Sequence, residues 1–219
     1  MKINGYLVGV IGTNCYLVWD EETDEAMLID PGDYDAAITR DIADNGLWLK
    51  YIVVTHGHGD HIGGAPGFLA EFPEAKLVCG KDDIPLVSDT DLNISAMFVG
   101  KKVVIQPDIF PVDGDVLKLG NLSFVTLATP GHSAGGLSFY VAECSAAFKA
   151  QAFSGTVFSG DTLLNVSVGR TDQPGGDFNT LRSSIRNILF KLPDDTLVLP
   201  GHMDPTTIGR EKRFNPFVS

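Results

Sequence analysis

The sequence is short of positive charge and of long apolar runs, and each shortage excludes a class of protein. Only 16 of the 219 residues are lysine or arginine, against 28 acidic residues, so the formal net charge is −12. Nucleic acids and anionic membrane surfaces bind positively charged proteins, so we expect neither as a partner. No apolar run approaches the roughly 18 residues that a membrane span requires.

Cysteine is also scarce, and its pattern predicts no disulfide framework. The three cysteines, Cys15, Cys79 and Cys144, are scattered and form no Cys-x-x-Cys pair. Residues 1–5 have no apolar core and no small-residue cleavage site, so they do not form a signal peptide by pattern. We therefore expect a reduced, cytoplasmic protein in which each cysteine is a small buried residue.

Histidine numbers only five, yet three histidines stand together in residues 55–61, Thr-His-Gly-His-Gly-Asp-His. This stretch follows the apolar run 51–54, which predicts a buried strand. Imidazole and carboxylate are ligands that suit zinc and similar ions. The two glycines are expected to let the backbone turn tightly, so that the side chains converge. The stretch therefore predicts a metal site rather than a solvated polar turn.

Three further residues stand at strand ends of the same kind. His132 and His202 each follow a glycine, and Asp161 follows a short apolar run. Together with the first stretch they give seven candidate metal ligands: His56, His58, Asp60, His61, His132, Asp161 and His202. Seven ligands are too many for one tetrahedral ion, and they suit two ions that share a carboxylate.

The apolar periodicity predicts many strands and few helices in one α/β domain over residues 1–219. Strands are expected at 3–12, 14–19, 25–30, 51–54, 76–78, 116–119, 122–128, 137–142, 156–158 and 196–199. Helices are expected at 34–45, 67–72, 81–88, 178–190 and 206–214. Residues 89–110 give no firm prediction, and residues 143–155 are expected to form an exposed connection.

These motifs resemble the metallo-β-lactamase superfamily, and most closely its glyoxalase II-like hydrolases. Besides the ligand set, the resemblance includes the phrases at residues 14–18, 29–32, 129–133, 159–162 and 169–172. The phrases at 174–177, 206–209 and 215–217 resemble a short, single-domain bacterial branch. The resemblance implies an αββα four-layer sandwich, in which two mixed β-sheets are flanked by helices. It also implies that no separate C-terminal helical domain binds glutathione.

The same resemblance implies a role for each ligand. His56, His58 and His132 would hold one divalent ion. Asp60, His61 and His202 would hold the second, and Asp161 would bridge the two. We expect Zn²⁺, with iron or manganese as alternatives. Hydroxide between the ions would hydrolyse a thioester of the hydroxyacylglutathione type, with Asp60 and Asp161 as the catalytic carboxylates.

One alternative activity stays open at this point, with lactone, phosphodiester and RNA substrates as subordinate options, and two further interpretations are disfavoured. A persulfide dioxygenase on the same fold would bind one iron through His56, His132 and Asp161. A lactamase with a thiolate ligand is disfavoured, because the corresponding residue is Asp161 rather than cysteine. A protein without catalytic activity is disfavoured because all seven ligand positions are intact.

The substrate is expected to be a small anionic thioester, and Arg170 is the candidate residue that binds it. A guanidinium group can hold a carboxylate through two hydrogen bonds. Arg170 would otherwise brace its own loop through Asp172 or Asp177. Four further residues are expected to form hydrogen bonds that support the metal ligands, namely Asp30, Thr55, Ser133 and Thr162. Residues of these types are also common as caps of turns, which is the alternative role.

Overall fold

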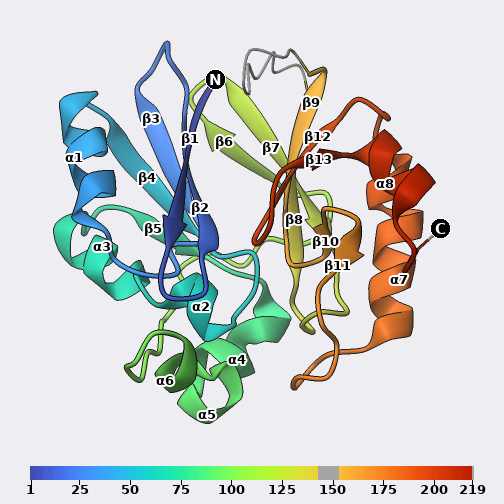
Figure 1. Cartoon of the computed structure of the whole chain (residues 1–219). Helices are drawn as coiled ribbons and strands as arrows, with labels where there is room; N and C mark the ends of the chain where they lie inside the picture. Colours follow the sequence, from blue (N-terminus) through green and yellow to red (C-terminus); the bar gives the residue numbers. More distant parts are fainter. Residues whose placement is uncertain (143–152, 219) are drawn as a thin grey trace.

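Two mixed β-sheets pack face to face, and helices cover the outer face of each sheet (Figure 1). The computed structural model describes residues 1–142 and 153–218. The predicted αββα sandwich is therefore confirmed. Most of the expected connection at 143–155, together with Cys144, lies outside the described residues.

The first sheet is built from the N-terminal third of the chain. Its strands, in spatial order, are β1 (Lys2–Val8), β2 (Thr13–Trp19), β3 (Glu25–Ile29), β4 (Trp48–Val53) and β5 (Lys76–Val78). The first three strands are antiparallel neighbours, and β3, β4 and β5 run parallel. Two helices, α1 (Ala36–Asp44) and α3 (Ala65–Glu71), pack on its outer face through Ile38, Ile42 and Phe68.

The second sheet comes from the C-terminal half of the chain. In spatial order it contains β13 (Thr206–Thr207), β12 (Leu197–Pro200), β9 (Gly155–Gly160), β8 (Leu137–Ala142), β7 (Leu122–Ala128) and β6 (Val116–Leu119). Its outer face is covered by α7 (Phe178–Asn187), the 3₁₀ turn η2 (Leu189–Lys191) and α8 (Ile208–Phe214). A separate two-stranded ribbon, β10 (Leu163–Leu164) and β11 (Ser167–Val168), follows β9.

An apolar layer lies between the sheets and fixes their separation. Tyr16 and Phe158 meet edge to face there, with ring centroids 5.4 Å apart. Phe124 and Phe139 are also fully buried in this layer. Removing this much apolar surface from water is the main source of the sandwich's stability.

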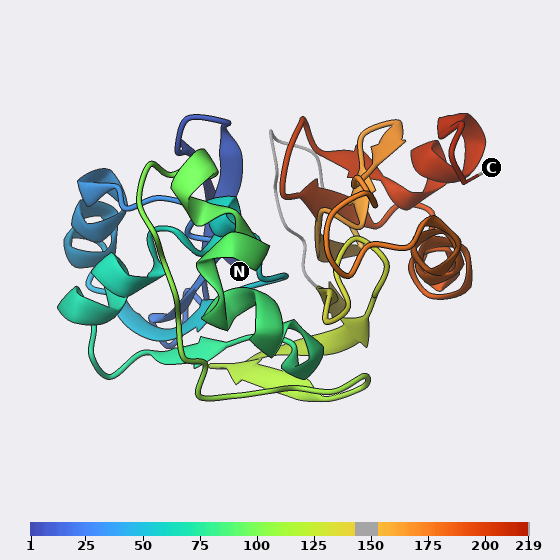
Figure 2. The same cartoon turned by 90° about the horizontal axis from the view of Figure 1, so that it is seen from below.

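Residues 59–62 and 81–98 fold into short helical turns beside the strand ends of the first sheet (Figure 2). They are α2 (Gly59–Ile62), the 3₁₀ turn η1 (Lys81–Asp83), α4 (Ile84–Ser88), α5 (Thr90–Asn93) and α6 (Ser95–Phe98). Residue Ile94 joins the last two helices in a left-handed conformation (φ 59°). The apolar pattern of 89–110 was uninformative because each turn here is only four residues long.

The predicted elements differ from the observed ones mainly at their ends. Residues 206–207 were predicted to open a helix, but they form β13 beside β12, and α8 begins at Ile208. Asp177 caps α7, since its side chain accepts a hydrogen bond from the Thr180 amide. Cys15 and Cys79 are free and buried, as predicted. Among the described residues, no helix is both long and apolar enough to cross a membrane.

Candidate metal centre

The strand order brings the predicted ligands to one place. β8 is antiparallel to both β7 and β9, and β12 is parallel to β9. The carboxyl ends of β7, β9 and β12 therefore lie at the same edge of the second sheet, and these ends are followed by His132, Asp161 and His202. The four remaining ligands follow β4 of the first sheet. The site is thus assembled from both halves of the sandwich.

His56, His58 and His132 form the first group of ligand atoms. Nε2 of His132 lies 3.0 Å from Nε2 of His56 and 2.9 Å from Nδ1 of His58. Burial lowers the pKa of His56 well below its usual value and that of His58 to about 3, so both rings are neutral at pH 7. Neutral imidazoles offer lone pairs, and tetrahedral zinc places its ligand atoms about 3.3 Å apart. The group therefore fits a metal ion.

Asp60, His61 and His202 form the second group. Oδ2 of Asp60 lies 3.3 Å from Nε2 of His61 and 3.0 Å from Nε2 of His202. Burial alone would raise the pKa of Asp60, but His61 and the hydrogen bond from His202 lower it strongly. Asp60 is therefore an ionised carboxylate, which is the form that binds metal.

Asp161 stands between the two groups. Its Oδ2 lies 3.7 Å from Nε2 of His132 in the first group and 3.7 Å from Nε2 of His202 in the second. Its Oδ1 lies 3.7 Å from Nε2 of His61 and has no hydrogen-bond partner within the described residues. A buried carboxylate oxygen without a partner is costly. Coordination to a metal ion shared by the two groups would satisfy it. Among the described residues, two possible ligand groups have the membership of the expected ones, and a third combines His56, His61 and Asp161.

Among the described ligand candidates, the partly exposed ones are Asp161 and His202. The side chains of His56, His58, Asp60, His61 and His132 are buried. Asp161 is 12% exposed and His202 is 21% exposed. Solvent therefore reaches the ligand groups at the residues that follow β9 and β12.

Comparison with known proteins agrees with this site. Residues 8–202 match the profile of the metallo-beta-lactamase superfamily. The chain belongs to that superfamily. The hydroxyacylglutathione hydrolase GloC of Haemophilus influenzae is 36% identical over 220 residues, which cover 100% of this chain and 99% of GloC. The profile, this relative and the ligand groups together make the chain a metal-dependent hydrolase.

Two solved structures share the fold and about a third of the aligned residues of this superfamily member. The B3 metallo-beta-lactamase BLEG-1 is 32% identical, with a TM-score of 0.85 over 99% of each chain. TTHA1623, solved in a di-iron-bound form, is 34% identical, with a TM-score of 0.81 over 98% of this chain and 99% of its own. The second of these shows that a close relative holds two metal ions.

Three of the histidines are oriented by contacts behind the centre, as is usual for metal-binding histidines. Nδ1 of His132 donates to the main-chain carbonyl of Arg170 at 2.7 Å. Nδ1 of His61 lies 3.0 Å from Oδ2 of Asp30, and Nδ1 of His56 lies 3.1 Å from the Thr55 hydroxyl. In each ring the Nε2 atom is therefore free to face the metal. The predicted supporting roles of Asp30 and Thr55 agree with these contacts.

The other two predicted supports contact different partners. The Ser133 hydroxyl donates to Asp83, and the Thr162 hydroxyl donates to Thr129, so neither touches a metal ligand. Asp83 is a fully buried carboxylate in η1 that the sequence analysis did not select. It follows Lys81 and Asp82 in a polar stretch, and no sequence signal separated it from a surface residue.

The glycines of the ligand stretch serve a different purpose from the one expected. Neither Gly57 nor Gly59 has a positive φ, so neither is needed for a left-handed turn. A Cβ on Gly57 would lie 2.8 Å from Cβ of Leu86, and one on Gly59 would lie 2.3 Å from Cα of Ser95. Both glycines are required because α4 and α6 pack directly on the ligand stretch. The unassigned region 89–110 thus covers the metal motif.

Arg170 braces its own loop through Asp172, the first of the two alternatives to substrate binding. Its guanidinium group makes two hydrogen bonds of 2.7 Å to the Asp172 carboxylate, and both side chains are exposed. Asp177 instead caps α7. The main-chain contact of Arg170 with His132 places the residue beside the centre, so substrate binding by its side chain stays a prediction.

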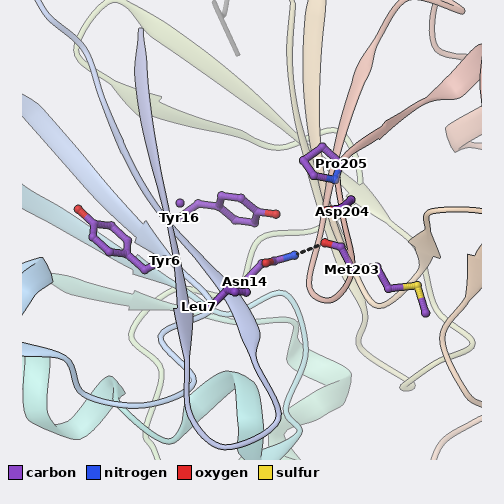
Figure 3. Close-up of a pocket in the computed structure, with 8 residues that line it drawn as sticks. Tyr6, Leu7, Asn14, Tyr16, Met203, Asp204 and Pro205 are labelled. Carbon is purple, nitrogen blue, oxygen red and sulfur yellow. Dashed lines mark hydrogen bonds between the residues drawn. The ribbon is translucent and has the colours of Figure 1, made fainter. Parts of the chain in front are cut away.

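The first sheet also holds the loop that carries His202. The Asn14 side chain donates to the carbonyls of Pro200 and Met203 at 2.9 and 2.8 Å, and the Tyr16 hydroxyl donates to Pro200 at 2.8 Å. Figure 3 shows Asn14 and Tyr16 pointing from β2 toward this loop. A cavity of about 450 Å³ lies between the two segments and is lined by Gly5, Tyr6, Leu7, Asn14, Tyr16, Met203, Asp204 and Pro205.

Proposed function

We propose that this protein hydrolyses thioesters of the hydroxyacylglutathione type with the help of two divalent metal ions. Zn²⁺ is the first choice, and iron or manganese are the alternatives. The carrying observation is that the Asp161 carboxylate reaches both ligand groups, with 3.7 Å separations on each side. The full-length likeness to a protein named hydroxyacylglutathione hydrolase supports the choice of substrate class.

Each residue of the centre has its own proposed role in hydrolysis. Bound divalent ions lower the pKa of water to about 7 and polarise a carbonyl group. His56, His58 and His132 are neutral ligands that leave the positive charge of an ion undiminished, which favours an anionic substrate. Asp60 and Asp161 are the carboxylates that would hold the ions and could accept hydrogen bonds from a water molecule at the centre. His202, which is partly exposed, lies where the substrate would enter.

The proposed substrate is a small anionic thioester, and neither nucleic acid nor a membrane is a proposed partner. Arg170 is proposed to bind the substrate's carboxylate, in exchange for its bond to Asp172. Because both side chains are exposed, that ion pair contributes little and can be replaced. A reduced cytoplasmic compartment fits the free thiols of Cys15 and Cys79.

The deciding experiment combines metal analysis with three substrates. Protein purified without added metal is analysed for zinc, iron and manganese per chain, and is then assayed with S-lactoylglutathione, glutathione persulfide and a chromogenic β-lactam. About two metal equivalents with thioester cleavage are expected. The β-lactam is included because a solved relative is named a B3 metallo-beta-lactamase.

Each other result points to a different activity of the same fold. One iron per chain, with oxygen consumption on the persulfide and no thioester cleavage, would favour the dioxygenase that uses His56, His132 and Asp161. Cleavage of the β-lactam without cleavage of the thioester would replace the proposed substrate class. Two metal ions with none of the three activities would leave the hydrolase class and refute the substrate.

A further inference from the structure

Asp83 is a buried acid outside the metal ligands that connects two of the loops carrying them. It ends η1, and its side chain is fully buried. None of the ion pairs in the described part of the chain involves this carboxylate. A buried charge without a countercharge is expensive unless hydrogen bonds compensate for it, so the partners of Asp83 require an explanation.

Asp83 has three hydrogen-bond donors, and they come from two different loops. The Gly57 amide donates to Oδ2 at 2.8 Å, and Gly57 lies between the ligands His56 and His58. The Ser133 hydroxyl donates to Oδ2 at 2.8 Å and the Gly135 amide donates to Oδ1 at 2.6 Å, both directly after His132. One carboxylate thus spans the first-sheet loop and the second-sheet loop that supply the first ligand group.

The packing around Asp83 leaves these loops little freedom. A Cβ on Gly135 would lie 2.3 Å from the Asp83 amide nitrogen, and a Cβ on Gly80 would lie 2.0 Å from the Gly135 carbonyl oxygen. The backbone on both sides therefore touches η1 directly. Small errors in the placement of a ligand loop translate into poor metal geometry, because ligand distances must be held within tenths of an ångström.

We propose that Asp83 is a positioning residue that sets the separation of the His56–His58 loop from the His132 loop and so determines the metal affinity of the first ligand group. This inference rests on the proposed two-metal centre. Asp83 touches no ligand side chain, and it acts through the backbone at Gly57 and Gly135 and through Ser133. The second ligand group has its own supports in Asp30 and Asn14, so Asp83 is expected to affect one ion only.

The substitution Asp83→Asn tests the proposal with almost no change of volume. The two backbone amides bond to different oxygens of the carboxylate, Gly57 to Oδ2 and Gly135 to Oδ1. Whichever way the asparagine amide is oriented, its NH₂ group meets one of these N–H donors and cannot accept. One loop therefore loses its attachment. Asp82→Asn is the matched control, because Asp82 is the exposed neighbour in the same turn.

The measurement is Zn²⁺ affinity, determined by competition with a chromophoric chelator on metal-free full-length protein. His202→Ala leaves the first group complete, and His58→Ala leaves the second group complete. In the His202→Ala background, Asp83→Asn is expected to weaken Zn²⁺ binding by about 10–100-fold, the usual cost of losing a supporting residue. In the His58→Ala background it is expected to match Asp82→Asn. Ser133→Ala should give a smaller loss of the same kind.

Three results would overturn the proposal. Equal affinities of Asp83→Asn and Asp82→Asn in the His202→Ala background would show that Asp83 does not position the first group. Equal losses in both backgrounds, or a lower melting temperature of metal-free protein with unchanged affinity, would show a general structural role. Wild-type protein that binds one Zn²⁺ would refute the two-metal function, while the comparison in the His202→Ala background would still decide the role of Asp83.

Discussion

Nδ1 of His61 lies 3.0 Å from Oδ2 of Asp30, which joins the end of β3 to the ligand stretch after β4. The backbone of Asp30 is left-handed (φ 51°), an uncommon state for a residue other than glycine. Its carboxylate also accepts hydrogen bonds of 2.7 Å from the amide and the hydroxyl of Thr55. Asp30 thus contacts the ring of His61 in the second ligand group directly, and it reaches His56 of the first group only through Thr55.

Asp30→Asn is expected to weaken metal binding by the second ligand group by about 10–100-fold. An amide cannot accept from Thr55 on both sides, and it carries no charge to attract the proton on His61. The check is Zn²⁺ affinity by chelator competition in the His58→Ala background. Asp24→Asn is the control, because Asp24 has the same left-handed backbone (φ 59°) at an exposed turn. Equal effects of the two changes would attribute the loss to backbone strain.

Asp161→Ala is expected to abolish hydrolysis, with a loss of more than about 100-fold, while most of the fold is retained. The change removes the one carboxylate that lies 3.7 Å from ligands of both groups. Turnover of S-lactoylglutathione, metal content per chain and far-ultraviolet circular dichroism are measured together. Asp204→Ala, at an exposed position two residues after His202, is the control. Near-normal turnover by Asp161→Ala would contradict the two-metal centre.

Arg170→Ala is expected to raise KM for an anionic thioester more than for a neutral one, with little change in kcat. The main-chain carbonyl that orients His132 is unaffected by the substitution. Asp172→Ala separates the two possible roles, because it removes the brace but keeps the guanidinium group. An equal change of KM for both substrates, reproduced by Asp172→Ala, would assign Arg170 to bracing alone.

A low pH is expected to weaken one connection between the two sheets, the one that Glu25 of β3 makes with the turn between β6 and β7. The pKa of Glu25 is lowered by hydrogen bonds from Lys50 and from the Gly120 amide in the turn between β6 and β7. Because the pKa of Glu25 is lower in the folded than in the unfolded state, its ionisation stabilises the folded protein at pH values above the unfolded pKa of about 4.3. This stabilisation is lost as the pH falls through the folded pKa.

Glu25→Gln is therefore expected to lower the free energy of unfolding by about 0.5–1 kcal/mol at pH 7 and to have a smaller effect near pH 3. Urea unfolding at the two pH values measures the difference. Glu74→Gln, at an exposed position after α3, provides the control. A loss that is the same at both pH values would mean that the charge of Glu25 does not contribute.

Much of the fold and the seven candidate ligands that the structure brings together could be predicted from the sequence, because each feature has a local signal. The ligands follow apolar runs, and α7 carries its cap at Asp177. Asp83 had no such signal, because its donors lie 26 and 52 residues away along the chain. The predicted role of Gly57 and Gly59 was wrong for the same reason, because the packing of α4 and α6 on them could not be predicted. Contacts between distant segments cannot be deduced from local periodicity.

Each ligand group contains residues that follow strands of both sheets, so bound metal would also stabilise the packing of one sheet against the other. Each ion would take ligands from the segment after β4 on one side and from the segment after β7 or β12 on the other, so it would connect the two sheets. Metal that binds only the folded chain adds its binding energy to folding. The working temperature range of the protein would then depend on the supply of metal in the cell. Metal-free protein would be less rigid where the two sheets meet, and it would also lack hydrolytic activity.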